Sequence, residues 1–366
     1  MVTTSLTTDV VILGAGISGL SVARQLCRVG LRTIVLEARE RVGGRLLSVG
    51  DAGSIGDAGR VDLGATWFWG NEERVARLCS DLNVPTFPQA GNGDDLHEMM
   101  GTVRRWPSDR AGIAEFRVDG GTATLAERLA AALPDGVLRL QARAKSVTRL
   151  ENGQHLRVDF EEDDRNVGIA TTHVVVALPP ALAVSSLTFQ PALDEELTAV
   201  MTRTPVWMGA TGKFLVVFDR PFWREAGLSG RAFSRSGPLF EIHDASGRDD
   251  VPAALFGFCM PRGLQDPGPS ENEVLAQLTR LFGEQAKEPK AVHKKLWWLE
   301  DLTVPEEALA LNDYSHYGHP LLQRSAWNGF LHWSTTETAS FAPGHIEGAL
   351  EAAERVASFI EDGRDS

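Results

Sequence analysis

The sequence predicts an α/β fold, and three features of its 366 residues support this prediction. Short, wholly apolar runs are followed by segments with helical periodicity near the start of the chain. A glycine-rich turn joins the first apolar run to the first helical segment. The chain is also too long for one ordinary core, so a second domain or an appended lobe is expected.

The first three elements form one βαβ unit. Residues 10–13 are apolar throughout, as a parallel strand buried on both faces requires. Residues 17–29 follow with an apolar stripe on one helical face, and Gly30 is expected to end this helix. Residues 33–36 supply the second strand. This order is that of a Rossmann-like unit.

The turn between strand and helix carries Gly-Ala-Gly-Ile-Ser-Gly. Gly14 permits the tight turn, Gly16 lets the backbone approach a pyrophosphate, and Gly19 lets the helix pack close to the sheet. The helix N-terminus, which includes Ser18, supplies N–H groups to phosphate. Glu37 ends the second strand, where it can accept hydrogen bonds from ribose hydroxyls and would repel a 2′-phosphate. The unit therefore predicts a dinucleotide with an unphosphorylated ribose.

The residues after Glu37 favour FAD over NAD. They run Ala-Arg-Glu-Arg-Val-Gly-Gly-Arg and contain Arg39, Gly44 and Arg45. The glycine pair lets the chain return over the pyrophosphate, and Arg45 can lie against it. This extension resembles flavin-binding proteins of the glutathione-reductase-like fold, so all three residues are expected to bind the cofactor.

The rest of the chain is predicted in less detail. Residues 50–60 read as a loop and residues 88–115 as an irregular segment. Apolar periodicity predicts the other elements. They are helices over 72–82, 122–133, 271–282 and 346–360, and strands over 145–150, 155–160, 173–178, 213–218 and 291–296.

Composition limits the partners. The net charge of −13 argues against nucleic acid and anionic membranes, since both attract basic surfaces. There is no apolar run of about 18 residues, and residues 1–9 lack the features of a secretory signal. Cys27, Cys79 and Cys259 form no CxxC pair, which predicts free thiols. A cytoplasmic protein without a metal site is expected.

Beyond Arg45 the chain resembles the flavin-dependent amine oxidase family, which includes monoamine and polyamine oxidases, and looks like a short bacterial-type member. Residues 62–67, Asp-Leu-Gly-Ala-Thr-Trp, resemble the family segment along the flavin ring. Gly120-Gly121 and residues 174–180 match the return into the FAD domain and the strand that leaves it. Thr336-Glu337-Thr338 and residues 344–349, before the last helix, match the family's C-terminal FAD segment.

The resemblance assigns further cofactor contacts. It implies a backbone contact from Val147 to adenine, a place for Trp298 near the flavin ring, and an acid, Glu337, at the ribityl or phosphate region. The last helix can point its N-terminus, with the N–H of Ile346, at the flavin pyrimidine, where reduced flavin carries negative charge. The full set of contacts expected from this resemblance comprises Gly64, Ala65, Thr66, Trp67, Val147, Trp298, Thr336, Glu337, Gly344, His345 and Ile346.

Lys213 is the expected catalytic residue. It lies in Gly-Lys-Phe-Leu-Val-Val-Phe, followed by Pro-Phe-Trp, and this order is similar to the family's lysine strand. There the lysine reaches a water that bridges to flavin N5, where an ammonium can help oxygen accept electrons or orient a water for imine hydrolysis. The alternative is a surface lysine on an edge strand.

The chain departs from the family in four places. About fifty residues separate Trp67 from Gly120, so the helical lobe over the substrate is reduced; the site is then open, covered by a partner subunit, or adapted to a large substrate. His345 stands at the second aromatic-cage position, where monoamine oxidases have Tyr, and the first position falls within residues 303–320 without an assignment. That stretch has no cysteine, so FAD should be non-covalent. Ser334-Thr335 replaces the usual Ala-Gly.

The predicted organisation follows from this resemblance. A Rossmann-like FAD-binding domain of the glutathione-reductase type takes residues 1–75, 120–202 and 301–366. A sheet-containing α+β substrate domain takes residues 76–119 and 203–300. Trp67, Trp69 and His345 are expected to line the substrate pocket, and packing at a domain boundary is the alternative for the tryptophans.

The predicted reaction is the oxidation of a small-molecule amine. Hydride passes from the carbon beside nitrogen to flavin N5, the imine hydrolyses, and O2 reoxidises the flavin to give hydrogen peroxide. A desaturase or a renalase-like oxidase of a non-amine substrate is the main alternative, and a non-catalytic flavin-fold binding protein is a further one. A flavin monooxygenase and an NAD dehydrogenase are disfavoured. The oligomeric state is open, with a homodimer as one option.

Overall fold

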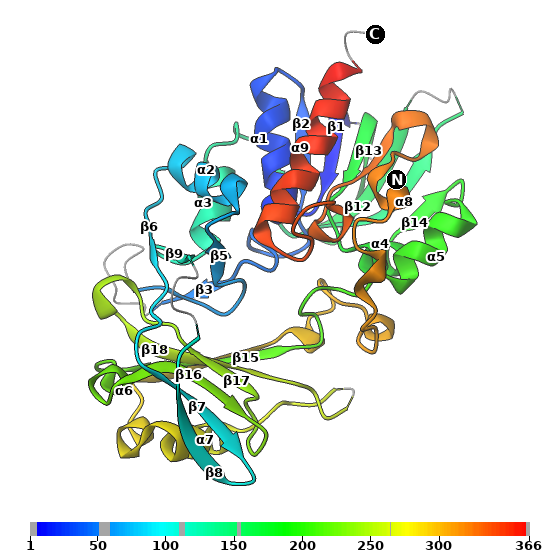
Figure 1. Ribbon diagram of the computed structural model, residues 1–366. Helices are drawn as coiled ribbons and strands as arrows, with labels where there is room; N and C mark the ends of the chain where they lie inside the picture. The colour runs from blue at the N-terminus through cyan, green and yellow to red at the C-terminus, as the bar shows by residue number, and fades with distance from the viewer. Residues whose placement is uncertain (1–5, 51–58, 110–113, 152–154, 264, 364–366) are drawn as a thin grey trace.

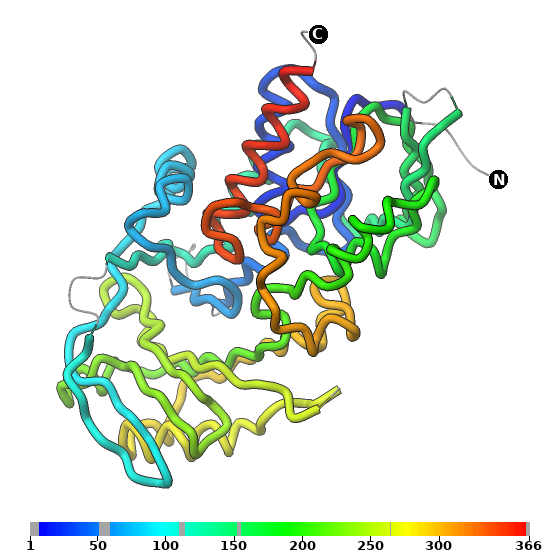
Figure 2. Tube along the Cα trace, turned by 45° about the vertical axis from the view of Figure 1, so that its right-hand side comes forward, coloured from blue at the N-terminus to red at the C-terminus, as the bar shows by residue number. Residues whose placement is uncertain are grey.

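The computed structural model describes residues 6–50, 59–109, 114–151, 155–263 and 265–363. Two large sheets dominate it, each with helices packed on it, and Figures 1 and 2 show them as an upper and a lower body. The prediction of an α/β protein with a second, sheet-containing domain is therefore confirmed. Most of the loop predicted at 50–60 lies outside the described residues.

The first sheet has a parallel centre. Its order is β10-β2-β1-β13-β12-β11-β14, with β20 also paired to β13. Strands β10, β2, β1, β13 and β20 run parallel, and β11 and β12 form an antiparallel extension with β13. The bounds are β1 Leu6–Leu13, β2 Thr33–Leu36, β10 Leu138–Arg139, β11 Ala142–Arg149, β12 Leu156–Glu162, β13 Arg165–Val176, β14 Thr188–Gln190 and β20 Leu331–Trp333.

The position of β1 in the sheet explains why residues 10–13 are apolar throughout. Val10 and Ile12 face one core, which they share with helices α1 (Ile17–Arg28), α3 (Ala123–Ala131) and α9 (Ile346–Asp362). Val11 and Leu13 face a second core on the other side of the sheet. Helix α5 (Glu195–Arg203), α8 (Pro320–Gln323) and α4 (Pro180–Ser186) contribute to that second core. Both faces are covered, as in a Rossmann-like domain.

Helices α1 and α9 join the two ends of the chain. They lie side by side against the first sheet, one near the N-terminus and the other at the C-terminal end (Figures 1 and 2). Helix α2 (Glu73–Asp81) packs with them, because Glu347 of α9 accepts hydrogen bonds from the backbone of Arg74 and Val75 in the first turn of α2. The predicted domain boundaries stay a prediction, and this packing favours a boundary after α2.

The second sheet has the order β19-β15-β18-β17-β16-β7-β8. Helix α7 (Glu271–Phe282) covers one face, where it shares a core with Phe214 and Val216. Lys213, Leu215 and Val217 point to the opposite face, toward the first domain. The bounds are β7 Asp94–Met99, β8 Thr102–Pro107, β15 Gly212–Phe218, β16 Leu228–Ser234, β17 Glu241–Asp244, β18 Ala253–Cys259 and β19 Ala291–Leu296.

Small elements connect the two sheets. Strand β9 pairs with both β5 and β6, and β3 pairs with β4. The segment over β4 and β5, residues 61–69, therefore runs between the two large sheets. The bounds are β3 Ser48–Val49, β4 Val61–Asp62, β5 Trp67–Trp69, β6 Thr86–Pro88, β9 Glu115–Val118 and α6 Phe222–Glu225.

Two predictions about local structure were wrong. Residues 88–115, expected to be irregular, contain β7, β8 and the start of β9. The buried residues of β7 include the acids Asp95 and Glu98, which pair with Arg231 and Arg280 from elsewhere in the chain, so this strand lacks an apolar alternation. Strand β1 also begins at Leu6 instead of residue 10, because its first part pairs with β13.

Among the helices in the described ranges, none has both the length and the apolar character needed to span a bilayer.

Candidate active site

The turn between β1 and α1 is shaped to receive a phosphate group. Gly14 has a positive φ of 104° and donates its N–H to the Leu36 carbonyl at 2.8 Å. A Cβ on Gly19 would lie 2.1 Å from the Gly14 oxygen, whereas a Cβ on Gly16 would meet no atom within 4 Å. Helix α1 has no side-chain cap and no acid in its first turn. Its N–H groups therefore face open space.

The acid at the end of β2 lies beside this turn. Glu37 is buried and its carboxylate accepts the backbone N–H of Ala15 at 2.8 Å and of Arg39 at 2.9 Å. The Arg39 guanidinium lies 3.6 Å from both Glu37 and Glu300 and donates to the Thr303 hydroxyl at 2.8 Å. The sequence thus brings Glu37 and Arg39 together at the carboxyl edge of the sheet, where open α/β sheets bind their ligands.

The second glycine pair folds back onto the first turn. Gly43 donates to the Ala15 carbonyl at 2.8 Å and forms a bridge with Gly16. Gly44 has a positive φ of 57°, and a Cβ there would lie 3.6 Å from the Gly16 Cα. This close approach of two backbones is what the predicted return of the chain requires.

The two ends of the chain meet here through side chains. Arg45 forms a two-bond ion pair with Glu337, at 2.6 and 3.1 Å, and Glu337 is fully buried. The hydroxyls of Ser18 and Ser334 lie 2.7 Å apart. The Thr336 hydroxyl donates to the His345 carbonyl at 2.7 Å, which fixes the start of α9. Residues separated by about three hundred positions therefore form one surface.

Lys213 is buried at the junction of the two sheets. Its Nζ donates to the Gly64 carbonyl at 3.0 Å and to the Thr66 hydroxyl, and it lies 3.8 Å from the centre of the Phe256 ring. Burial lowers the pKa of Lys213 to about 7; the nearby Asp62 opposes this shift and Arg117 adds to it. The prediction of a surface lysine on an edge strand is therefore excluded, because β15 lies between β18 and β19.

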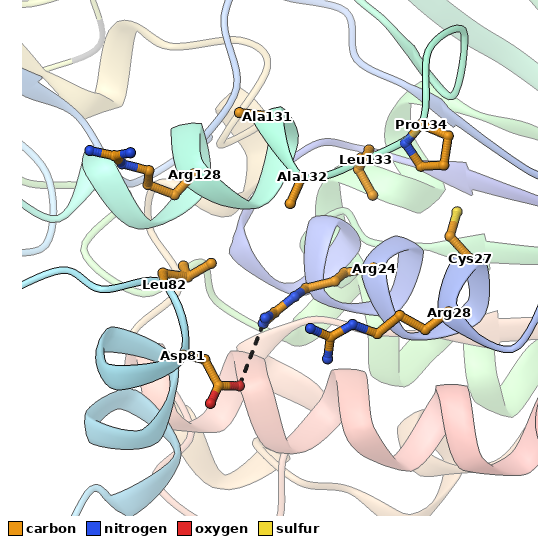
Figure 3. A pocket seen from close by; sticks show the side chains of 10 residues that line it. All are labelled: Arg24, Cys27, Arg28, Asp81, Leu82, Arg128, Ala131, Ala132, Leu133 and Pro134. Carbon is orange, nitrogen blue, oxygen red and sulfur yellow. Dashed lines mark ion pairs between the residues drawn. The ribbon is translucent and has the colours of Figure 1, made fainter.

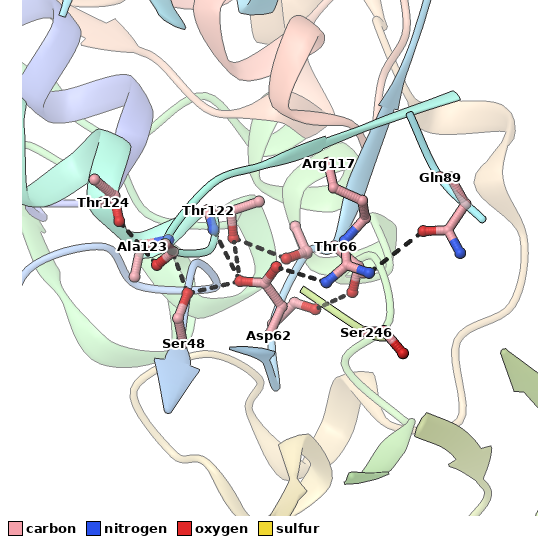
Figure 4. A network of polar contacts seen from close by, with 12 residues as sticks. Ser48, Asp62, Thr66, Gln89, Arg117, Thr122, Ala123, Thr124 and Ser246 are labelled. Atoms are coloured by element: carbon pink, nitrogen blue, oxygen red, sulfur yellow. Dashed lines mark hydrogen bonds and ion pairs between the residues drawn. The ribbon is translucent and has the colours of Figure 1, made fainter. Parts of the chain in front are cut away.

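Asp62 and Arg117 belong to a buried polar network (Figure 4). The Asp62 carboxylate accepts the Ser48 hydroxyl at 2.6 Å and the Thr122 N–H at 2.8 Å. Arg117 lies 3.7 Å from Asp62 and donates to Gln89 at 3.3 Å. Burial lowers the pKa of Arg117. The network fixes both charges that act on Lys213.

The shifted pKa of Lys213 predicts a pH-dependent stability. Between pH 7 and the ordinary lysine value of 10.5, the unfolded state binds more protons than the folded state. Stability therefore rises with pH across this window, as the cost of a buried ammonium disappears. Lys213→Met removes that cost, so its stability relative to the natural protein should be greatest below pH 7 and should decline toward pH 10. Thermal unfolding of both proteins at several pH values tests this; a constant difference would contradict it.

Aromatic side chains lie on both sides of the segment 64–69. The Trp69 and His345 rings stack at 4.7 Å with an angle of 21°, and Trp207 lies 6.1 Å from His345. On the other side, the Trp67 ring lies 5.0 Å from His243 and 5.5 Å from Phe256. The three predicted pocket residues are thus divided between two clusters, with Trp69 and His345 in one and Trp67 in the other.

Two predicted cofactor residues, Val147 and Trp298, are buried in the packing of the two sheets. Trp298 packs in the core of the second sheet and donates to the Asp266 carbonyl at 2.9 Å, while its neighbour Trp297 donates to the Leu63 carbonyl at 3.2 Å. Val147 is fully buried within β11, between β12 and β14. It is five residues, or about 16 Å, from Ala142, which donates to the Glu37 carbonyl at 2.8 Å.

Several residues at the site could not be predicted from any sequence motif. Glu72, whose carboxylate lies 2.6 Å from the His345 ring, is the first residue of the helix predicted over 72–82 and belongs to no motif. Trp207 lies in a connection between α5 and β15, and its ring contacts Gly344 and His345. Trp297 and Trp298 differ only in the direction of their side chains: one indole bonds to the Leu63 carbonyl and the other to the Asp266 carbonyl.

A surface pocket of about 450 Å³ lies away from this junction (Figure 3). It is lined by Arg24 and Arg28 in the last turns of α1, by Arg128 and by Asp81, which lies 3.7 Å from Arg24. The glycine turn is at the other end of α1, so this pocket is separate from the site described above.

The donor set at the junction fits FAD. An uncapped helix N-terminus and the open space over Gly16 suit the pyrophosphate, and Glu37 suits a ribose. Helix α9 also begins without a side-chain cap, so a second set of N–H groups is available for the flavin ring. With a buried lysine between the two sheets, the fold and the site define a dinucleotide-binding oxidoreductase.

Comparison with known proteins identifies the family. The model of flavin containing amine oxidoreductases matches residues 17–115 and 89–360. The chain therefore belongs to this family, and it is an FAD-dependent oxidoreductase of the amine oxidase type. The predicted resemblance, the cofactor and the enzyme class are confirmed.

Individual relatives are distant but cover nearly the whole chain. A Mycobacterium tuberculosis protein described as a flavin-containing monoamine oxidase is 27% identical over 457 residues, covering 97% of this chain and 96% of the relative. Amine oxidase B of Sus scrofa is 24% identical, covering 96% and 86%. A solved structure of putrescine oxidase shares the fold, with a TM-score of 0.83, 22% identity, and coverage of 98% of this chain and 100% of the other.

Proposed function

We propose that this enzyme oxidises a primary or secondary amine at the carbon next to nitrogen, with O2 as the electron acceptor. The observation that carries the proposal is Lys213, a buried lysine fixed against the Gly64–Thr66 segment between the two domains. Flavin-containing monoamine oxidases and putrescine oxidase are among the similar proteins. Bound FAD would supply the hydride-accepting group, and the chain would supply position, exclusion of water and proton transfer.

The backbone would hold most of the cofactor. The first turn of α1 and the open approach at Gly16 and Gly44 would take the pyrophosphate, and Glu37 would accept the ribose hydroxyls. The N–H of Ile346 at the start of α9 would donate to the flavin pyrimidine. The ion pair of Arg45 with Glu337 would brace the two segments that enclose the cofactor.

Two of the predicted cofactor positions are better filled by neighbouring residues. The register of β11 shifts between Ala144 and Ser146, which releases backbone groups from the ladder near Glu37. The adenine contact would therefore come from Ala144 and not from Val147. Trp297, whose indole reaches the carbonyl of Leu63, would replace Trp298 beside the flavin ring.

Lys213 would act on a proton and a water. With a pKa near 7, both its neutral and its charged forms are accessible at ordinary pH. The neutral amine can accept a hydrogen bond from water, and the ammonium can stabilise negative charge that develops beside it. Its Nζ is already fixed by Gly64 and Thr66, so little motion is needed to use it.

The substrate would enter past Trp69, Trp207 and His345. The alignment with the mycobacterial relative extends over 457 residues, whereas this chain has 366, so the relative carries insertions without a counterpart here. This difference supports the proposal of a reduced lobe and an accessible site. Tyr314, which is exposed and lies 5.5 Å from Trp207, is the better candidate for the first cage position than Tyr317, which bonds the Pro205 carbonyl.

Anaerobic titration of the purified yellow protein tests the proposed function. We expect alkylamines to bleach the flavin absorbance and NADH to leave it unchanged, and admission of air to restore the absorbance with release of hydrogen peroxide. Bleaching by NADH alone would overturn the amine substrate. Rapid reoxidation by a quinone but not by air would overturn the choice of O2; one similar protein is an L-amino acid dehydrogenase of Synechocystis, 24% identical over 96% of this chain and 94% of the relative. The cytoplasmic location and a homodimer stay predictions.

A further inference from the structure

His345 is paired with a buried carboxylate. Its Nδ1 lies 2.6 Å from Oε1 of Glu72, and the Glu72 side chain is 4% exposed. The other oxygen of Glu72 accepts the Trp69 N–H at 2.9 Å. Both oxygens of this carboxylate therefore accept a hydrogen bond, one from the His345 imidazole and one from the backbone of Trp69, whose ring stacks on that imidazole.

This pairing decides which nitrogen of His345 carries a proton. An ionised carboxylate only accepts hydrogen bonds, so Nδ1 must donate to Glu72. In the neutral imidazole Nε2 then has no hydrogen and is free to accept one. The His345 side chain is 31% exposed, so the ring remains accessible although Trp69 covers one of its faces.

We propose that His345, oriented by Glu72, removes a proton from the ammonium group of the substrate before the amine is oxidised. The inference rests on the proposed function and assigns a base to that same site. One N–H bond of the ammonium breaks, an N–H bond forms at Nε2, and the imidazolium later returns the proton to water. The step involves no change of oxidation state. Glu72 acts as a positioning residue that accepts the Nδ1 hydrogen and holds the ring.

Such a base answers a chemical need of amine oxidation. An alkylammonium with a pKa near 10 is about 99.9% protonated at pH 7, and the nitrogen lone pair is required when hydride leaves the adjacent carbon. Aromatic walls can hold an ammonium by its charge but cannot take its proton. A histidine at this position can do both, because its ring stacks on Trp69 while Nε2 bonds to no group among the described residues.

The surrounding charges support the assignment. Glu347, in the first turn of α9, is neutralised by Arg74 at 3.1 Å, and Arg74 also pairs with Glu354 at 2.7 Å. Trp69 and Trp207, the aromatic neighbours of the ring, are uncharged, and Tyr314 lies beyond Trp207. Glu72 is therefore the nearest anion whose charge acts on His345.

The test compares two substrates in His345→Phe, which keeps an aromatic ring on Trp69. One substrate is an ordinary alkylamine, and the other is a fluorinated amine whose ammonium is already deprotonated at the assay pH. We expect anaerobic flavin reduction by the alkylamine to slow by about 10- to 100-fold relative to the natural protein, and reduction by the fluorinated amine to change little. Glu72→Gln should slow the alkylamine reaction alone, by a smaller factor.

Three further measurements separate the outcomes. In His345→Phe the alkylamine rate should rise with pH as free amine accumulates, more steeply than in the natural protein. Added imidazole should restore part of the rate in His345→Ala. His97→Phe, on β7 in the other domain, should match the natural protein. Equal slowing with both substrates would show that His345 only shapes the pocket and takes no proton. Failure of the natural protein to oxidise any amine would instead overturn the proposed function.

Discussion

Gly16→Val is expected to give a folded protein that no longer retains FAD. The residue lies at φ −70° and ψ 174°, a conformation open to any side chain, and a Cβ there meets no protein atom within 4 Å. The added methyl groups would instead occupy the space through which a pyrophosphate approaches the first turn of α1. We expect FAD affinity to fall by about 100-fold or more, a loss of roughly 3 kcal/mol.

The flavin content of the purified protein and its circular dichroism measure the two parts of this prediction. Gly19→Ala is the matched control, because its Cβ would lie 2.1 Å from the Gly14 oxygen and must disturb the packing of α1 on β1. The first variant should lose flavin and keep its fold, and the second should lose stability. Normal flavin content in Gly16→Val would contradict the cofactor position.

Lys213→Met is expected to keep FAD and to lower turnover by about 100-fold. The substitution keeps most of the side-chain volume but removes the Nζ that bonds to Gly64 and Thr66. Among the described residues, the Lys213 Nζ contacts Gly64, Thr66 and Phe256, which lie outside the turn at residues 14–19, so the cofactor should stay bound. Stopped-flow measurement of flavin reduction and of reoxidation shows which half-reaction depends on the amine.

Lys294→Met provides the control for this experiment. Lys294 lies on the neighbouring strand β19, opposite Phe214, and is exposed. It should behave as the natural protein in both half-reactions. Unchanged rates in Lys213→Met would remove Lys213 from the mechanism and leave its burial as a structural feature.

Local sequence was sufficient for the dinucleotide unit but not for the second sheet. The turn at Gly14–Gly19 is determined by residues close in the chain, so its spacing could be interpreted directly. Strand β7 could not be recognised, because its buried Asp95 and Glu98 are neutralised by Arg231 and Arg280, more than 130 positions later. A pattern of buried charges looks like a surface loop until its partners are known.

At the candidate site, too, local sequence could not predict contacts between residues that are distant in the chain. Family motifs located Glu337 and His345, but not the acid that orients His345, since Glu72 lies 273 positions away in the chain. The neighbouring residues Trp297 and Trp298 also could not be told apart from local sequence. One indole faces the flavin-ring segment and the other faces the core of the second sheet, and this choice depends on how the chain leaves β19.

Side chains of β15 point alternately to the two faces of the second sheet, and this alternation constrains where relatives can insert or delete residues in the substrate domain. Phe214 and Val216 hold α7 on one side of this strand, while Lys213 and Leu215 face the first domain on the other. Inserting or deleting one residue in β15 would exchange these two sets, sending the lysine into the α7 core and a phenylalanine to the active site. Length variation in this domain must therefore accumulate in its loops, such as the turn between β7 and β8, and not within the strand that carries the lysine.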